Sequence, residues 1–139
     1  MQNKCPLEWE EQAALIQWLN LMPALRQYVI KIHNEGERTH GQTWHLQKQG
    51  LCAGASDLFI AYPVGQSHGL WLEVKRNMKY HASAMEKPTW VRQQRFQDMM
   101  RAVGYEAVTC YGWEHGKQLV ESYLSNGRAM PDNTDGSLP

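Results

Sequence analysis

The chain has 139 residues, of which 42% are hydrophobic and 20% charged, so it can form one domain with a single core and is not wholly disordered. Its 14 basic and 14 acidic residues cancel to a net charge of zero, which excludes a protein that coats nucleic acid through bulk charge. No stretch approaches the roughly 18 apolar residues of a membrane span, and three widely spaced cysteines favour free thiols in a reducing compartment. We therefore expect a cytoplasmic protein without a membrane partner.

The first predicted elements are a helix, a short strand and a second helix. Apolar residues recur at helical spacing over about residues 7–22, and Pro23 ends that helix. The β-branched and aromatic run over residues 27–32 predicts a strand. A shorter helix is expected over residues 41–49, with Gly50 as its stop signal.

A hairpin and a long helix follow. Residues 56–62 and 69–75 read as two strands, and the turn residues between them favour an antiparallel pair. After a polar loop, Pro88 suits the first turn of a helix that Gly104 ends. The predicted buried stripe of this helix consists of Phe96, Met100 and Val103.

The last predicted elements are a buried strand over residues 105–111 and a helix over residues 114–124. Residues 127–139 lose all periodicity and are expected to form a flexible tail, so residues 1–126 make up the domain. The order α-β-α-β-β-α-β-α predicts an α/β fold with a small mixed sheet flanked by helices.

Two carboxylates and a lysine occur where these strands should be apolar. Glu73 and Lys75 point to the same side of their strand, because side chains alternate, while Val74 points into the core. Asp57 on the paired strand can reach the same end of the sheet. Two converging carboxylates suit Mg²⁺, and the neighbouring lysine can hold a water or a phosphate. The alternative is an ordinary solvated strand face.

The first helix adds acidic residues to this picture. Glu8, Glu11 and Gln12 lie on its apolar face, whereas Glu10 does not. Buried carboxylates need a charged partner or a metal, although acids in a first turn are also favoured by the helix dipole. Glu8 has the better spacing with Gln12, and Glu11 is the runner-up for a place in the acidic cluster.

Basic residues gather beside the proposed site. Seven bases and two acids lie between residues 75 and 101, a local net charge of +5 that the remaining chain offsets. Such a patch is expected to contact a phosphate backbone, although charged helices are often simply solvated. The expected DNA-contacting residues are Arg76, Lys79, Lys87, Arg92 and Arg95.

Two other chemistries are disfavoured. Zinc could be bound by His40 with His45, or by His33 with Cys52, but no Cys-x-x-Cys or comparable pair is present. A nucleophile could be built from Cys110 and His115, yet Cys110 falls in a strand that reads as buried. We expect Cys110 to belong to the core.

Taken together, these residues resemble the VRR-NUC family of the PD-(D/E)XK nuclease superfamily over about residues 8–124. The matching segments are Glu8-x-x-x-Gln12, His33-Asn34-Glu35-Gly36, Gly54-Ala55-Ser56-Asp57-Leu58, Gly69 to Arg76, and Gln93. The chain departs from the family at Ser56, where members carry proline, and at Trp90, where they carry serine or threonine.

The resemblance implies a restriction-endonuclease-like core and a Mg²⁺- or Mn²⁺-dependent endonuclease that hydrolyses DNA. Stand-alone members from phages and bacteria are similar to Holliday-junction resolvases, so a homodimer acting on branched DNA is expected. The implied metal ligands are Asp57, Glu73, the Val74 carbonyl and Glu8. The implied catalytic residues are Glu8, Asp57, Glu73, Lys75, which would orient or activate the attacking water, and Gln93, with Gln12 and Glu35 supporting them. The alternative is a module of the same fold that binds branched DNA without cutting it.

Overall fold

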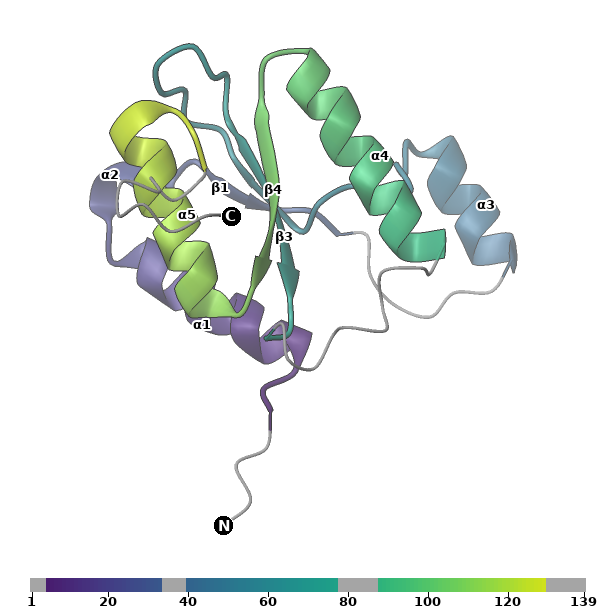
Figure 1. Cartoon of the computed structure of the whole chain (residues 1–139). Helices are drawn as coiled ribbons and strands as arrows, with labels where there is room; N and C mark the ends of the chain where they lie inside the picture. Colours follow the sequence, from purple (N-terminus) through teal and green to yellow (C-terminus); the bar gives the residue numbers. More distant parts are fainter. Residues whose placement is uncertain (1–4, 34–39, 78–87, 130–139) are drawn as a thin grey trace.

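The computed structural model describes residues 5–33, 40–77 and 88–129 of the chain. Helices are interspersed along the chain with the strands of a small central sheet (Figure 1). In chain order they are α1 (Glu8–Asn20), α2 (Pro23–Arg26), β1 (Val29–Lys31), α3 (His40–Lys48), β2 (Leu58–Ile60), β3 (Leu70–Lys75), α4 (Pro88–Ala102), β4 (Glu106–Tyr111) and α5 (Trp113–Asn126). All the predicted elements are present, and the expected α/β fold class is confirmed.

The short helix α2 was not predicted. Pro23 ends the apolar periodicity of α1 as expected, but it also stands at the first turn of a new helix. Its missing N–H and fixed φ suit that position. The proline therefore redirects the chain toward β1, and Leu25 is buried as a result.

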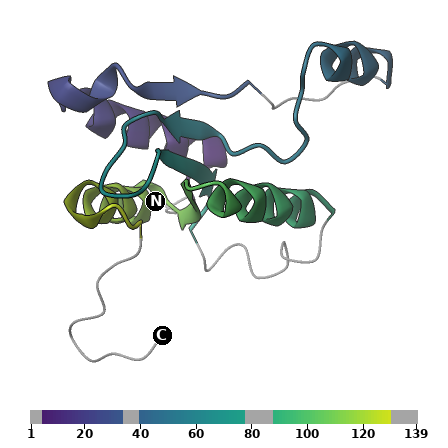
Figure 2. The same ribbon diagram turned by 90° about the horizontal axis from the view of Figure 1, so that it is seen from above.

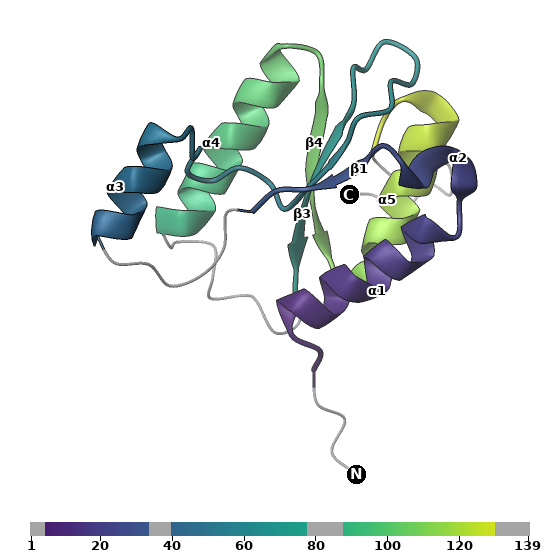
Figure 3. The ribbon, with the colours of Figure 1, turned by 180° about the vertical axis from the view of Figure 1, so that it is seen from behind.

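The sheet has the order β1-β2-β3-β4. The predicted hairpin is confirmed, since β2 and β3 pair antiparallel with Leu58 opposite Leu72. β3 and β4 are parallel, and α4 makes the crossover between them. Viewed from above and from behind, α1 and α4 lie on opposite sides of β3 (Figures 2 and 3).

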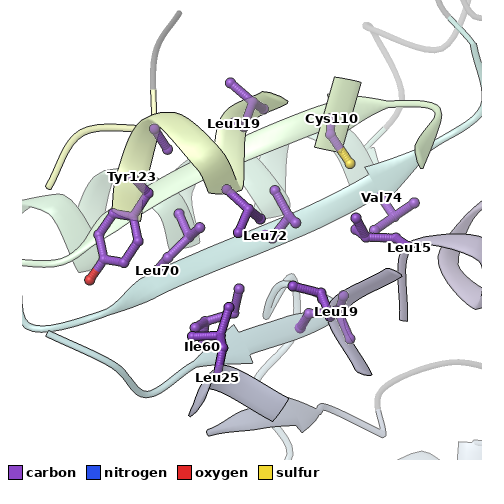
Figure 4. Close-up of a cluster of buried hydrophobic side chains, with 13 residues drawn as sticks. Leu15, Leu19, Leu25, Ile60, Leu70, Leu72, Val74, Cys110, Leu119 and Tyr123 are labelled. Carbon is purple, nitrogen blue, oxygen red and sulfur yellow. The ribbon is translucent and has the colours of Figure 1, made fainter. Parts of the chain in front are cut away.

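The core lies between the sheet and the helices α1 and α5. Leu72 and Val74 of β3 point into it, between Leu15 of α1 and Leu119 of α5 (Figure 4). Cys110 is fully buried in the same cluster, so the prediction that it is a core residue is confirmed. Because the even-numbered side chains of β3 fill the core, Glu73 and Lys75 must face the other side.

The predicted buried stripe of α4 is partly wrong. Phe96 is buried against Trp71 of β3, but Val103 is 59% exposed. The second buried position is Gln97, whose amide donates to the Thr109 hydroxyl at 2.8 Å. A buried polar side chain is tolerated when it is hydrogen-bonded, and that partner lies on another element.

The first three residues of the expected tail pack onto the domain. α5 continues to Asn126, and Gly127 ends it in a left-handed conformation with φ of 76°. Ala129 is fully buried, and its N–H donates to a Glu106 carboxylate oxygen at 3.3 Å. Residues 127–129 therefore belong to the domain, because Gly127 caps α5 and Ala129 is bonded to Glu106 of β4. Residues 130–139 lie outside the described residues. None of the helices in the described ranges is long and apolar enough to span a bilayer.

Candidate active site

The Asp57 carboxylate lies at the end of the β2–β3 ladder. β2 begins at Leu58, which is paired with Leu72, so Val74 lies beyond the last residue pair between β2 and β3. The Asp57 side chain takes its place and accepts a hydrogen bond from Val74 N at 2.8 Å. Because Gly112 N donates to the carbonyl of Lys75, strand alternation turns the Val74 carbonyl toward Asp57 rather than toward β4.

Glu73 is the most unusual side chain of the site. It is only 3% exposed, and its Oε1 accepts a hydrogen bond from Gln93 Nε2 at 2.8 Å. Its other oxygen, Oε2, is buried and has no hydrogen-bond partner within the described part of the chain. Burial, and then the nearby charge of Asp57, raise the pKa of Glu73 to about 8, although Lys75 acts in the opposite direction.

Lys75 connects the sheet to α1. Its Nζ lies 3.4 Å from Glu73 Oε1 and 3.8 Å from Glu8 Oε1. The Lys75 side chain is largely buried, at 16% exposed, whereas that of Glu8 is 47% exposed. Glu8 therefore stands at the solvent side of the site, and Lys75 lies between the two glutamates.

Glu11, the other candidate from α1, has different surroundings. It is buried, and its carboxylate accepts a hydrogen bond from the backbone N–H of Trp113 at the start of α5. Gly112 makes this approach possible, because its φ is 89° and an added Cβ would lie 3.1 Å from Glu11 Oε2. Of the two glutamates, Glu8 has an ion pair with Lys75, while Glu11 joins α1 to α5. Nothing local in the sequence signals this contact between distant residues.

The segment before Asp57 is pressed against α4. Gly54 has φ of 84°, and a Cβ at this position would come within 2.5 Å of the Arg92 carbonyl oxygen. Only glycine allows so close an approach of two backbones. The contact holds the segment before Asp57 against α4, the helix that also carries Gln93.

The remaining predicted residues have mixed outcomes. Arg92 and Arg95 are exposed on α4, and Gln12 is half-buried on α1. Arg76 donates hydrogen bonds to the carbonyls of Cys5 and Pro6, so it also anchors the N-terminal segment. Three further predicted site residues, Glu35, Lys79 and Lys87, lie outside the described residues.

The donor set fits a hard cation such as Mg²⁺. Among the described residues, no three His, Cys, Asp or Glu side chains gather closely enough to hold a metal by themselves. A cation here would bind the Asp57 and Glu73 carboxylates and the Val74 carbonyl, with water completing the shell, as Mg²⁺ commonly does. The unpartnered Glu73 oxygen supports this fit, because a cation would satisfy it and offset the repulsion from Asp57.

The fold matches that of a known domain. No family model and no curated protein matches the sequence. A solved structure described as a "VRR_NUC domain protein" superposes on this one with a TM-score of 0.72 at 22% identity, covering 93% of this chain and 100% of that chain. At this identity the likeness establishes the fold: the chain has the fold of a VRR_NUC domain protein, in agreement with the resemblance of its sequence motifs.

Proposed function

We propose that the protein is a Mg²⁺- or Mn²⁺-dependent endonuclease that hydrolyses DNA phosphodiesters. One observation carries the proposal: Glu73 is buried with an unsatisfied carboxylate oxygen, next to Asp57 and Lys75. A fold that keeps a carboxylate in this state without function gives up stability. The likeness to a VRR_NUC domain protein supports the same conclusion.

Each residue has a role in this proposal. Asp57, Glu73 and the Val74 carbonyl hold the metal, and Gln93 fixes the Glu73 carboxylate through its 2.8 Å hydrogen bond. The bound metal supplies stabilisation of the charge that develops on the phosphate and lowers the pKa of a bound water. The Lys75 ammonium, held between Glu73 and Glu8, donates a hydrogen bond to the attacking water or to a phosphate oxygen.

DNA is bound over α4 in this proposal. Arg92 and Arg95 are exposed on the helix that carries Gln93, and Arg76 follows the site lysine directly. Together with Lys79 and Lys87 they supply charge for phosphate contacts. Because one chain of 139 residues covers little more than one duplex arm, we propose a two-fold homodimer that cuts branched DNA such as a four-way junction.

The test is a cleavage assay on labelled duplex, nicked, flap and four-way junction DNA, with Mg²⁺ or Mn²⁺ against EDTA. The expected result is metal-dependent cleavage by the wild type, with preference for branched substrates and loss of cleavage in Lys75→Ala. Size measurement with and without junction DNA tests the dimer. Tight junction binding without cleavage in either metal would instead support the non-cleaving module.

A further inference from the structure

A pocket opens beside the candidate site, next to the edge strand β4. It has a volume of about 350 Å³ and is lined by residues of the strand β4 and of the helices α4 and α5. The two helices lie on either side of β4 in Figure 1. That volume falls in the range of small-ligand sites. The lining residues used below are Trp90, Arg101, Thr109, Tyr111 and His115.

The pocket continues the candidate site rather than standing apart from it. In the β3–β4 register Thr109 lies opposite Glu73, and Tyr111 lies opposite Lys75. Paired residues of parallel strands present their side chains to the same face, about 5 Å apart. A strand of DNA whose phosphate lies at Glu73 and Lys75 therefore has its neighbouring nucleotide next to this pocket.

The edge of β4 is protected against a further strand. Its even-numbered residues bond to β3, since Glu106 N donates to Gly69 O and Gly112 N to Lys75 O. The odd-numbered residues therefore turn their backbone groups outward. Arg101 donates to the Ala107 carbonyl at 2.6 Å, and the Tyr111 N–H donates to His115 Nδ1 at 3.0 Å. These side chains occupy the positions that an added peptide strand would need.

Thr109 lies between these two protected positions. Its outward N–H and carbonyl have no partner within the described ranges of the chain, while its hydroxyl is bonded to Gln97. One free donor next to one free acceptor suits a compact planar group with complementary edges. Nucleobases present such edges, whereas a peptide strand would need several successive pairs.

The walls of the pocket suit a planar ligand. Trp90 and Tyr111 contribute aromatic surface, and the Tyr111 ring is stacked on His115 with an interplanar angle of 13°. His115 Nδ1 accepts the Tyr111 N–H, so its proton lies on Nε2. Burial lowers the pKa of His115, which favours a neutral donor rather than a phosphate-binding cation.

We propose that this pocket receives an unstacked nucleobase from a nucleotide next to the scissile phosphate, held by stacking on Trp90 and Tyr111 and by the Thr109 backbone. The inference rests on the proposed function and adds to it a source of substrate selectivity. Unstacking a base has the lowest cost where DNA is already single-stranded or branched. The pocket would therefore favour such substrates over intact duplex.

The test is binding of fluorescently labelled single-stranded and four-way junction DNA in EDTA, so that no cleavage is needed. Tyr111→Leu and Trp90→Leu remove the stacking surface, whereas Tyr111→Phe keeps it. Tyr28→Leu is the control, because Tyr28 is an exposed tyrosine that precedes β1, at the opposite edge of the sheet. Base–aromatic stacking predicts about 5- to 100-fold weaker binding for the two leucine variants and wild-type binding for Tyr111→Phe and Tyr28→Leu.

Abasic substitution at each position of the DNA identifies the bound base. At one position, loss of the base should weaken wild-type binding by the same factor as Tyr111→Leu, with no further loss when the two are combined. Two results would contradict the proposed base pocket: abasic and Tyr111→Leu losses that multiply at every DNA position, or leucine variants that bind DNA like wild type. If the wild type cleaves DNA and the losses multiply, only this inference fails; if coupling is found without cleavage, only the proposed hydrolysis fails. Thermal unfolding of each variant confirms that it is folded.

Discussion

Glu11 and Glu73 are both buried glutamates, 7% and 3% exposed, yet their surroundings are opposite. The Glu11 carboxylate accepts a backbone N–H at the first residue of α5, a helix of 14 residues whose dipole favours a negative charge there. Glu73 has one amide donor and Lys75, faces Asp57, and keeps a buried oxygen without a partner in the described part of the chain. Of these two glutamates, Glu73 is the one with a buried carboxylate oxygen that a further ligand could satisfy.

We propose that this difference separates a structural carboxylate, Glu11, from a functional one, Glu73. A buried charge is tolerated when hydrogen-bond donors or an opposite charge replace water. At Glu11 another part of the fold provides the donor, so the interaction is complete within the chain. At Glu73 a cation would complete it, which is why the comparison between the two residues can be tested by substituting each.

The largest expected effect is on cleavage. Glu73→Gln should lower the cleavage rate by roughly three orders of magnitude or more, because a metal ion supplies several kcal/mol of charge stabilisation. Its thermal stability should be equal to or above that of wild type, since the substitution replaces a buried carboxyl group that lies near Asp57 and has one oxygen without a hydrogen-bond partner among the described residues. Single-turnover assays with saturating enzyme measure the rate. Glu11→Gln is the matched control and should cleave like wild type; equal losses in both variants would remove the distinction.

The next effect is on stability. Glu11→Ala should lower the free energy of unfolding by about 1.5–3 kcal/mol, because the partly buried Trp113 N–H loses its carboxylate acceptor. Urea denaturation monitored by circular dichroism measures it. Glu10→Ala serves as the control, since this exposed neighbour only accepts the N–H of Leu7 and its loss should have a smaller effect. Loss of cleavage in Glu11→Ala at unchanged stability would instead place Glu11 in the metal site.

Two glutamines of α4 extend the same comparison. Gln93→Met should reduce metal affinity or activity by about 10- to 100-fold, because Gln93 is hydrogen-bonded to Glu73 and would orient this proposed metal ligand. Titration of cleavage rate against Mg²⁺ concentration measures this change. Gln97→Met removes the buried bond to Thr109 and should lower stability without altering the Mg²⁺ dependence. An unchanged Mg²⁺ titration in Gln93→Met would show that the Glu73 contact has no part in metal binding.

The smallest expected effect, counted per pH unit, is a dependence of stability on pH. Folding raises the pKa of Glu73 from 4.5 to about 8, so between these values the folded chain binds more protons at this group than the unfolded chain does. The contribution of Glu73 to stability therefore falls as pH rises from about 4.5 to 8, by at most about 1.4 kcal/mol per pH unit. Below this window both states are protonated, and above it the loss is complete.

The difference in unfolding free energy between wild type and Glu73→Gln, measured from pH 5 to 8 in EDTA, isolates this contribution. The wild type should lose stability relative to the variant as pH rises, and Mg²⁺ should restore it at the upper end. A constant difference would mean that Glu73 is ionised throughout the range.

Local patterns predicted most of the fold for identifiable reasons. Alternation in residues 69–75 turned Val74 to the core and Glu73 and Lys75 away from it, and the turn before them produced the hairpin. The stripe of α4 was predicted less well, because Val103 lies just after the end of α4 and is exposed, whereas Gln97 is buried and bonded to Thr109 of β4. A periodicity shows which side chains share a face, but not where the neighbouring element ends.

For the candidate site, the sequence by itself determined which residue types stand at the end of the hairpin, since Asp57, Glu73 and Lys75 follow from strand spacing and motif alone. Only the tertiary structure shows that Glu8 and Glu11 have different partners. Both lie on one helix face, but the partners that distinguish them, Lys75 and Trp113, belong to distant parts of the chain. The physical reason is that burial and hydrogen bonding depend on what packs against a helix, which no spacing within that helix can specify.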